Sequence, residues 1–349
     1  MRILHVIFRI ITGGTENLII DIVNRQAAIG HKVTVMVINS GSDPSMLAKF
    51  DPAVRIITTE RAEGSRSMAK IAEINLRALA FRPDVVHIHN KRVVNLLVAP
   101  GLRRRMIHTL HTTGIELSGR QLRTRFTAIS HAVADDFRTR YGLDAPVVHN
   151  GIIADSVRPR MAPHGAIRSI VSVGRLDAPI KGQDLLIRAM ADPRLAGMTL
   201  TLMGAGASEA ELRALAAGLG VDDRITFAGT VARDDVYGRL ADFDLFVLPS
   251  RTEGFGLALA EAMAAGIPVV TADLPGPMEL ITTDGAAPLG LSFTAGSAAA
   301  LADAIAAAAA MAPDEIADMT RRARSHVDAQ FSIHATVDTF IRLYSQLKS

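Results

Sequence analysis

Hydrophobic positions along the chain form short buried runs, separated by longer stretches with one apolar face. Runs of strand length occupy residues 2–8, 32–38, 54–58, 84–89, 107–111, 126–130, 169–173, 200–203, 225–229, 244–248 and 269–271. Helical patterns lie between them, chiefly at residues 17–29, 67–81, 131–141, 209–218, 257–265, 301–310, 314–330 and 332–347. Because strand and helix alternate along most of the chain, the sequence predicts doubly wound α/β domains with parallel sheets.

The stretch from Asp244 to Asp273 shows this pattern most completely. An apolar run ends at Pro249, a turn with two glycines and an acid follows, and strong helix formers run from Leu257 to Ala265. This order places a helix N-terminus at the carboxyl edge of a parallel sheet, where anions bind.

Two glutamates give that stretch its candidate chemistry. Glu253 precedes the helix and Glu261 lies within it, so their backbones should be about 10–12 Å apart along the axis. The separation suits a ligand with hydroxyl groups at both ends and a diphosphate between them. For a generic acid pair, a capping acid and a surface acid would be the simpler interpretation.

Length and charge indicate two domains with different partners. The chain has 349 residues, and residues 1–150 carry 21 Lys and Arg against 12 Asp and Glu, whereas the rest carries 17 against 23. Arg103, Arg104 and Arg105 form a basic cluster that is either a solvated face or a contact for an anionic acceptor or an acidic membrane surface. We do not expect nucleic-acid binding, because aromatic residues do not interleave with the basic ones.

Several kinds of site are excluded by composition or pattern. The chain has no cysteine, which excludes disulfides and a thiol nucleophile. Its first residues lack a long apolar core, and no uninterrupted apolar stretch approaches a membrane span, so we expect a cytoplasmic protein. His87 and His89 alternate on one strand and point the same way, but no third ligand stands at a suitable spacing. We therefore expect no metal and no cofactor.

From position 249 the sequence reads Pro-Ser-x-x-Glu-Gly-Phe-Gly-Leu, and from 261 it reads Glu-Ala-Met-Ala-x-Gly-x-Pro-Val-Val. This string resembles the donor-site signature of the retaining glycosyltransferases of family 4. The resemblance extends over nearly the whole chain and implies the GT-B fold, in which two Rossmann-like doubly wound domains face each other across a cleft. By the same resemblance, the donor-site residues include Glu253, Gly254, Phe255, Gly256, Leu257 and Glu261.

Further segments resemble other parts of the family pattern. Gly174-Arg175-Leu176 followed by Lys181-Gly182 resembles an element that neutralises the donor diphosphate. Additional donor contacts implied by the resemblance are Gly13 and Gly14, Gly204, and Gly229 with Val231. His111 ends a strand where a family histidine contacts the donor sugar or its phosphate, so we assign it a catalytic role beside Glu253. A tight turn would explain the Gly13-Gly14 pair equally well.

The resemblance also sets the expected domain bounds. We expect an acceptor-binding domain at residues 1–153 with a crossing helix at 332–349, and a donor-binding domain at 166–331. Residues 274–279 depart from the family pattern, because prolines flank a single glycine where many members have a glycine pair. We expect a stiffened loop there.

The reaction implied is transfer of a sugar, with retention and without a metal, from a nucleotide-diphosphate donor to an acceptor hydroxyl. A UDP-sugar is favoured over a GDP-sugar, and the acceptor is a glycan or a lipid-linked glycan of surface polysaccharide or lipopolysaccharide assembly, reached in the cytoplasm or at the inner face of the plasma membrane. Glu253 would bind donor sugar hydroxyls and Glu261 the ribose diol; a covalent intermediate on Glu253 and same-face attack both stay open. Two alternatives are a GT-B sugar-nucleotide epimerase and a non-catalytic sugar-nucleotide-binding subunit.

Overall fold

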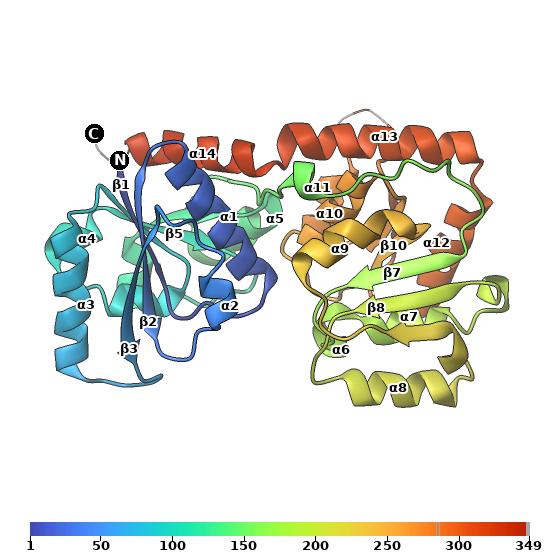
Figure 1. Ribbon diagram of the computed structural model, residues 1–349, viewed down its shortest axis with the longest axis horizontal. Helices are drawn as coiled ribbons and strands as arrows, with labels where there is room; N and C mark the ends of the chain where they lie inside the picture. Colours follow the sequence, from blue (N-terminus) through green and yellow to red (C-terminus); the bar gives the residue numbers. More distant parts are fainter. Residues whose placement is uncertain (284, 286, 347–349) are drawn as a thin grey trace. The chain divides into compact units, whose positions relative to one another are not determined.

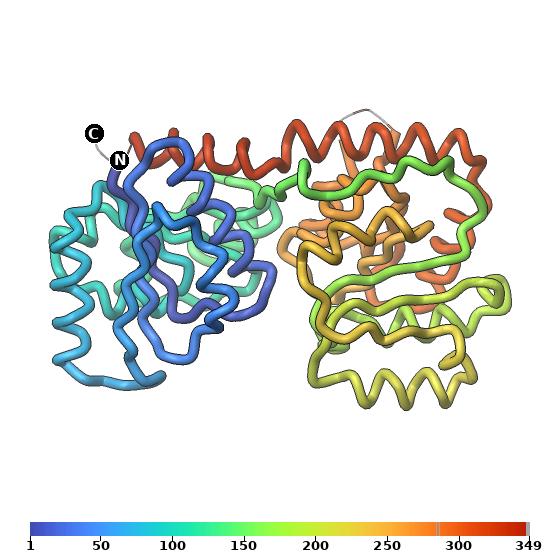
Figure 2. The backbone as a smooth tube through the Cα atoms, viewed as in Figure 1, coloured from blue at the N-terminus to red at the C-terminus, as the bar shows by residue number. Residues whose placement is uncertain are grey.

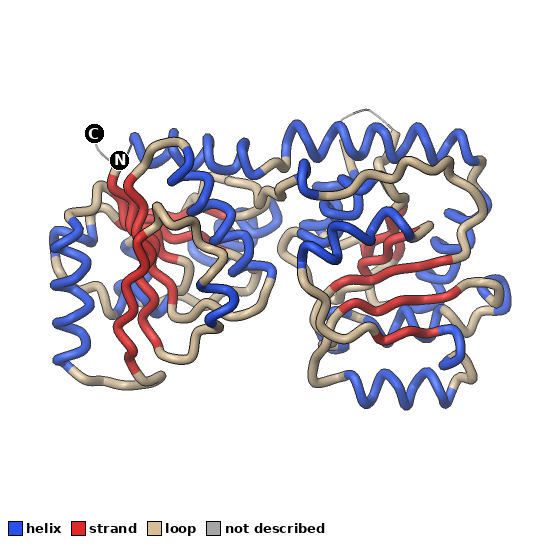
Figure 3. Tube along the Cα trace, viewed as in Figure 1, coloured by secondary structure: helices blue, strands red, loops and turns tan. Residues whose placement is uncertain are grey.

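The computed structural model describes residues 1–283, 285 and 287–346. The chain divides into two compact units, one formed by Met1–Gly151 with Ile333–Ser349 and the other by Ile152–Ser332. Each unit is built on a six-stranded parallel sheet whose faces carry helices (Figures 1 and 3). Among the described residues, no helix has the length and apolar character needed to cross a membrane. The predicted α/β class is confirmed.

The first unit has the strand order β3-β2-β1-β4-β5-β6. Its strands are β1 (Arg2–Ile7), β2 (Lys32–Asn39), β3 (Arg55–Arg61), β4 (Val85–Ile88), β5 (Met106–Leu110) and β6 (Arg125–Ala128). Its helices are α1 (Gly14–Ala28), α2 (Pro44–Leu47), α3 (Met68–Phe81), α4 (Pro100–Arg103), α5 (His131–Tyr141) and α14 (Ile333–Gln346), with short 3-10 turns η1 (Lys91–Asn95) and η2 (Gly119–Arg123).

Alternating strand residues of this unit supply two separate cores. Val33, Val35 and Val37 of β2 pack with the apolar face of α1, while Leu4 and Val6 of β1 pack with that of α3. The C-terminal helix α14 lies beside α1 (Figure 2). Burial on both faces explains why the strands read as continuous apolar runs in the sequence.

The second unit repeats the same order as β12-β11-β10-β7-β8-β9. Its strands are β7 (Ser169–Val173), β8 (Thr199–Met203), β9 (Ile225–Phe227), β10 (Leu245–Leu248), β11 (Val269–Ala272) and β12 (Leu291–Phe293). Its helices are α6 (Ala178–Lys181), α7 (Gln183–Ala189), α8 (Glu209–Gly218), α9 (Arg233–Arg239), α10 (Leu257–Ala265), α11 (Pro275–Ile281), α12 (Ala298–Ala310) and α13 (Pro313–Gln330), with 3-10 turns η3 (Ala154–Ser156), η4 (Pro193–Leu195), η5 (Asp222–Arg224) and η6 (Leu240–Asp242).

Both sheets reverse their order at one point, between β1 and β4 in the first unit and between β7 and β10 in the second. The loops that follow the two strands of such a pair leave in opposite directions and open a crevice at the carboxyl edge of the sheet. Ligands of open α/β sheets bind at this position. The residues that follow these four strands are therefore the first place to look for a site.

One expectation about local structure is wrong. The segment expected to be a stiffened loop at 274–279 is the beginning of α11, with Pro275 in its first turn. Proline suits this position because its fixed φ is helical and its missing N–H would have no partner in the helix. Between the prolines, Gly276 allows a close approach, since a Cβ there would come within 2.7 Å of the Gly254 carbonyl carbon.

Asp244, just before β10, offers a test of what holds the second unit together. Its carboxylate accepts hydrogen bonds from the backbone N–H groups of Arg168 and Ser169, both at 3.0 Å, and lies 3.2 Å from Arg160 Nη2. Burial raises the pKa of Asp244, but these hydrogen bonds outweigh burial and hold the pKa below its ordinary value. The carboxylate therefore stabilises the fold above the unfolded pKa, and this contribution is lost as the pH falls through the folded pKa.

We predict that Asp244→Asn lowers the free energy of unfolding by about 2 kcal/mol at pH 7, because a charged acceptor of several hydrogen bonds is lost. The difference from the unsubstituted protein should shrink as the pH falls from 7 toward 3, because the carboxylate of the unfolded chain takes up its proton before that of the folded protein does. Urea denaturation at pH 7 and at pH 3 measures this difference in the free energy of unfolding. Substitution of the exposed Asp222 by Asn is the control. An equal difference at both pH values would contradict the prediction.

Candidate active site

The loops that leave β7 and β10 of the second unit lie against each other through the backbone. Gly182 adopts φ +68°, and a Cβ at this position would overlap the Pro249 carbonyl group. The backbone N–H of Arg251 donates to the Ile180 carbonyl at 2.8 Å. Only glycine fits this combination of positive φ and close approach. The Lys-Gly pair in the sequence therefore brings the end of α6 to the loop before α10.

This approach places two of the predicted site residues in contact. Lys181 Nζ lies 2.7 Å from Glu253 Oε2, and the side chains are 27% and 16% exposed. The Ser250 hydroxyl donates to the same carboxylate oxygen at 3.4 Å. The pair lies at the point where the strand order reverses, half-buried and open to solvent. A cation and a carboxylate in this position can bind phosphate and hydroxyl groups of one ligand.

Arg251 holds the same loop in place, and sequence reasoning did not find it. Its guanidinium makes two hydrogen bonds to the Asp184 carboxylate, at 2.6 and 2.8 Å, and a third to the Ala178 carbonyl at 2.7 Å. The hydrogen bond to Asp184 raises the pKa of Arg251 above its ordinary value. Arg251 occupies an unspecified position of the Pro-Ser-x-x-Glu string, so only the complementary charge at Asp184 could have indicated it.

The helix that follows begins at a residue with no side chain to cap it. Gly256 is the N-cap of α10 with φ +104°, and no side-chain hydrogen bond caps the helix. Phe255 is 2% exposed and packs against Phe331, at 5.4 Å between ring centroids. The buried ring of Phe255 is therefore out of reach of a ligand, and this predicted site residue can contact one only through its backbone. The half-buried Leu257 starts the helix.

Glu261 has a partner that the sequence did not reveal. The Tyr237 hydroxyl of α9 donates to Glu261 Oε1 at 3.0 Å, and the side chain of Glu261 is half-buried. A carboxylate held in this way keeps its second oxygen in a defined direction. Tyr237 stands 24 positions from Glu261, and only the folded structure brings the two together.

The remaining predicted residues of the second unit lie along the same edge of the sheet. Gly204 and Gly229 form a backbone bridge after β8 and β9, with the Gly204 N–H donating to the Gly229 carbonyl at 2.8 Å. Val231 follows in the same turn and is half-buried. Arg175 follows β7, but its side chain is 67% exposed and its Nη2 lies 3.5 Å from Asp177 Oδ2.

In the first unit, two predicted elements follow the carboxyl ends of strands. Gly13 is the N-cap of α1 and Gly14 begins that helix after β1, while His111 directly follows β5. The cluster Arg103, Arg104 and Arg105 precedes β5 and therefore lies at the opposite, amino edge of the sheet. The structure does not bring these arginines to His111.

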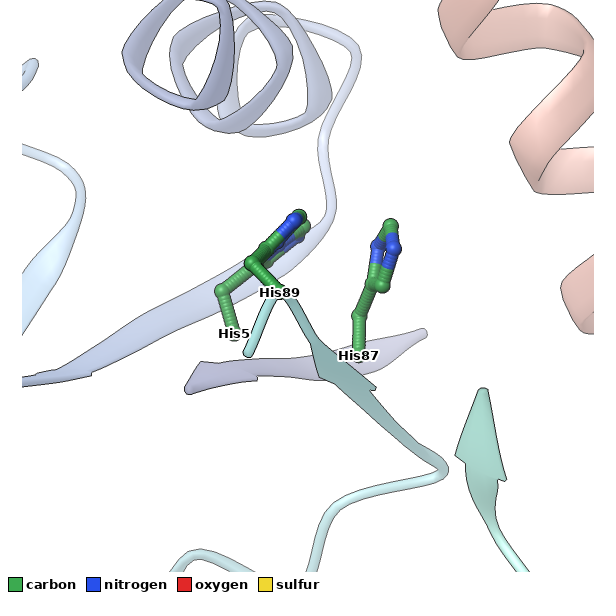
Figure 4. A group of neighbouring side chains, drawn as sticks. All are labelled: His5, His87 and His89. Carbon is green, nitrogen blue, oxygen red and sulfur yellow. The ribbon is translucent and has the colours of Figure 1, made fainter. Parts of the chain in front are cut away.

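Histidines gather beside His111 in a way that the sequence only partly indicated. His5 of β1 joins His87 and His89, and one ring nitrogen from each of the three lies within 4.8 Å of the others (Figure 4). His5 is the third histidine that the spacing did not reveal. However, each of the six ring nitrogens already has a hydrogen-bond partner in the protein. Burial lowers the pKa of His5 and of His111 to about 4, so both are neutral at pH 7.

Comparison with known proteins identifies the family of this architecture. The profile described as "Glycosyl transferases group 1" matches residues 167–310, and the one described as "Glycosyltransferase Family 4" matches residues 12–156. Together the two matches span most of the chain, one in each unit.

Curated relatives match over shorter stretches. A GDP-mannose-dependent alpha-(1-6)-phosphatidylinositol monomannoside mannosyltransferase of Mycobacterium tuberculosis is 33% identical over 175 residues, 44% of this chain and 45% of the relative. A phosphatidyl-myo-inositol mannosyltransferase of Mycobacterium leprae is 32% identical over 210 residues, 55% of each. The chain thus spans about half the length of the curated relatives it matches.

Solved structures match over nearly the whole chain at low identity. HepE (Alr3699) of Anabaena, solved with UDP and glucose, has a TM-score of 0.82 at 22% identity and covers 99% of this chain and 100% of its own. WaaG, a glycosyltransferase involved in lipopolysaccharide biosynthesis, has a TM-score of 0.74 at 20% identity, with 98% and 99% covered. The matched profiles show that the chain belongs to glycosyltransferase family 4, and the two parallel sheets in their shared order together with these structures show that it has the GT-B fold.

Proposed function

We propose that the chain transfers a sugar from a nucleoside-diphosphate sugar to an acceptor hydroxyl, with retention of the anomeric configuration. The observation that carries this proposal is the Lys181–Glu253 pair at the switch point of the second sheet, 2.7 Å apart and next to the uncapped N-terminus of α10. A cation, a carboxylate and the backbone N–H groups at the start of a helix suit a diphosphate joined to a polyhydroxylated sugar.

Stabilisation of the leaving group is the main chemical task of this reaction. As the bond between sugar and diphosphate breaks, negative charge grows on the phosphate oxygens. Lys181, Arg175 and the amides at the start of α10 are the groups that would stabilise this charge, because they are positioned before the reaction begins. Arg175 would have to turn from Asp177 toward the diphosphate, and its 67% exposed side chain is free to do so.

The two glutamates divide the binding of the donor between them. Glu253, held by Lys181 and Ser250, would bind sugar hydroxyls and support the positive charge that develops on the sugar. Glu261, held by Tyr237, would bind the ribose diol. When a diphosphate takes Lys181 as its counter-ion, Glu253 is released to the sugar, so binding of the donor completes the site.

The residues of the site define the chemical class of the acceptor less closely than that of the donor. The mycobacterial relatives are named for phosphatidylinositol acceptors and WaaG for lipopolysaccharide biosynthesis, which supports a lipid-linked glycan. The Arg103–Arg105 cluster, at the amino edge of its sheet, would contact an anionic membrane surface and not the reacting groups. Product analysis with soluble and lipid-linked glycan acceptors decides between the two acceptor classes.

The proposal predicts selective binding of one nucleotide class without a metal. A thermal-shift panel of UDP-, GDP- and ADP-sugars with EDTA present should show a clear rise in Tm for UDP-sugars or, second in order, for GDP-sugars. A ligand at 100 times its Kd stabilises the folded state by about 2.7 kcal/mol. No shift with any of the three classes would contradict the proposal, and a shift that EDTA abolishes would contradict a metal-free donor site.

Substitution of the two glutamates should separate their roles. We predict that Glu253→Gln lowers kcat about 100-fold, because it removes charge that acts in the transition state. Glu261→Gln should instead raise the KM for the donor about tenfold with a smaller effect on kcat, since it weakens a hydrogen bond made in both states.

Tyr237→Phe is the matched control, because it keeps the Glu261 carboxylate and removes only the hydroxyl that positions it. It should raise the KM by less than Glu261→Gln does. Steady-state kinetics with the donor identified by the thermal-shift panel gives all three values. Equal losses of kcat for the two glutamate variants would refute the assigned roles.

A further inference from the structure

A line of hydrogen bonds runs through the interior of the first unit and ends at His111. It starts at Gln26 of α1, whose Oε1 lies 2.8 Å from His5 Nε2. His5 Nδ1 lies 3.0 Å from His89 Nε2, and His89 Nδ1 lies 3.4 Å from His111 Nε2. The nearly parallel rings of His5 and His89 appear together in Figure 4. The line therefore connects a helix on one face of the sheet with a residue at its carboxyl edge.

The partners along the line fix where each proton lies. An amide oxygen only accepts, so His5 Nε2 carries a hydrogen and donates to Gln26. In a neutral ring the other nitrogen is then a bare acceptor, so His5 Nδ1 accepts from His89 Nε2–H. By the same rule, His89 Nδ1 accepts from His111 Nε2–H.

Burial ensures that the rings carry one proton each. It lowers the pKa of His5 to about 4 and that of His89 well below its ordinary value. The pKa of His111 is lowered to about 4 by the same cause. A second proton on His5 or His89 would also place two N–H groups against each other within the line. All three hydrogen bonds consequently point in one direction, toward Gln26.

We propose that His5 and His89 are positioning residues that hold His111 in a single tautomer, with Nε2 protonated and Nδ1 bare. Among the described residues, no group hydrogen-bonds to His111 Nδ1, and the side chain is only half-buried. A neutral ring with a bare nitrogen accepts a hydrogen bond and repels an anionic oxygen. His111 therefore contacts a substrate hydroxyl and not a phosphate, an assignment that rests on the proposed transfer reaction.

The same rings do not form a metal site in this arrangement. A metal ion would need a lone pair from each of His5, His87 and His89. The lone pair of His5 accepts from His89, and that of His89 accepts from His111. The ring of His87 is itself held between the Tyr344 hydroxyl and the Thr109 hydroxyl, both at 2.6 Å. Binding an ion would break the line that orients His111.

The direct test is the tautomer of His111 in the full-length protein, read from nitrogen-15 chemical shifts of the imidazole rings at pH 7. We expect Nε2–H at His111 and a nonprotonated Nδ1. Signals are assigned by substituting single histidines. A proton on Nδ1, an even mixture of tautomers, or a stoichiometric transition metal in the purified protein would each overturn the proposal.

A remote substitution shows whether the line sets the tautomer. Gln26→Leu removes the acceptor at the far end, so His5 Nε2–H would be buried without a partner unless the line reverses. We expect the signal of His111 to shift toward Nδ1–H. The matched control is Thr127→Val, which removes a buried hydroxyl that bonds to Thr109 at 2.8 Å and is not part of the line. An unchanged His111 signal in Gln26→Leu would overturn the assigned role of His5.

Kinetics then connects the tautomer to the reaction. His89→Phe, which removes the acceptor for His111, should lower kcat/KM roughly tenfold. His89→Asn should restore most of this loss, because its amide oxygen can accept from His111 Nε2–H. Equal losses in both variants would overturn the positioning role. If no nucleotide sugar proves to be a substrate, the proposed function fails, whereas the tautomer measurement still decides the proton arrangement.

Discussion

The contact between the Lys181–Gly182 turn and the Pro249 carbonyl is the constraint on which the candidate donor site depends. Gly182 permits the contact because it has no Cβ and adopts φ +68°. Arg251 closes the same junction through two hydrogen bonds to Asp184. Since β7 and β10 are neighbours in the sheet but distant in sequence, this junction is where their loops meet. It brings Lys181 and Glu253 to 2.7 Å from each other.

Both sheets have the same strand order and reverse it at one point, but the side chains at this point differ in charge between the two units. In the second unit, the switch point holds a half-buried pair of opposite charges that a diphosphate would separate. In the first unit, His5 lies on β1, His87 lies on β4 and His89 directly follows β4. All three are buried, and burial lowers their pKa values. The second unit thus presents opposite charges at its switch point, whereas the first presents neutral rings with a fixed hydrogen-bond direction.

Much of the fold followed from the sequence because it depends on local patterns. The helix at 257–265 and the strand at 169–173 have the predicted bounds, and α1 begins only three residues before the predicted start. The edge strand β12, at residues 291–293, was missed. Residues 274–279 were expected to be a loop because many family members have a glycine pair at this turn, whereas here Pro275 starts α11.

The site was predictable in its residues but not in its contacts. A motif marks Glu253, Lys181 and Glu261, yet it says nothing of Arg251, whose partner Asp184 lies 67 positions away. The contact of Tyr237 with Glu261 and the line of hydrogen bonds from Gln26 to His111 could not be predicted for the same reason. His5 and His89 stand 84 positions apart and meet because β1 pairs with β4. Long-range contacts of this kind depend on sheet order, which the alternation of elements does not determine.

The central claim is that the carboxyl-edge loops of residues 152–332 hold the nucleoside diphosphate. Backbone hydrogen–deuterium exchange, measured with and without saturating UDP or GDP, tests it most directly. The account predicts slower exchange in residues 174–182 and 249–261, with smaller effects around Gly204 and Gly229, and no change at the amino edge of that sheet. Protection confined to the amino edge, or to residues 1–151 alone, would contradict it.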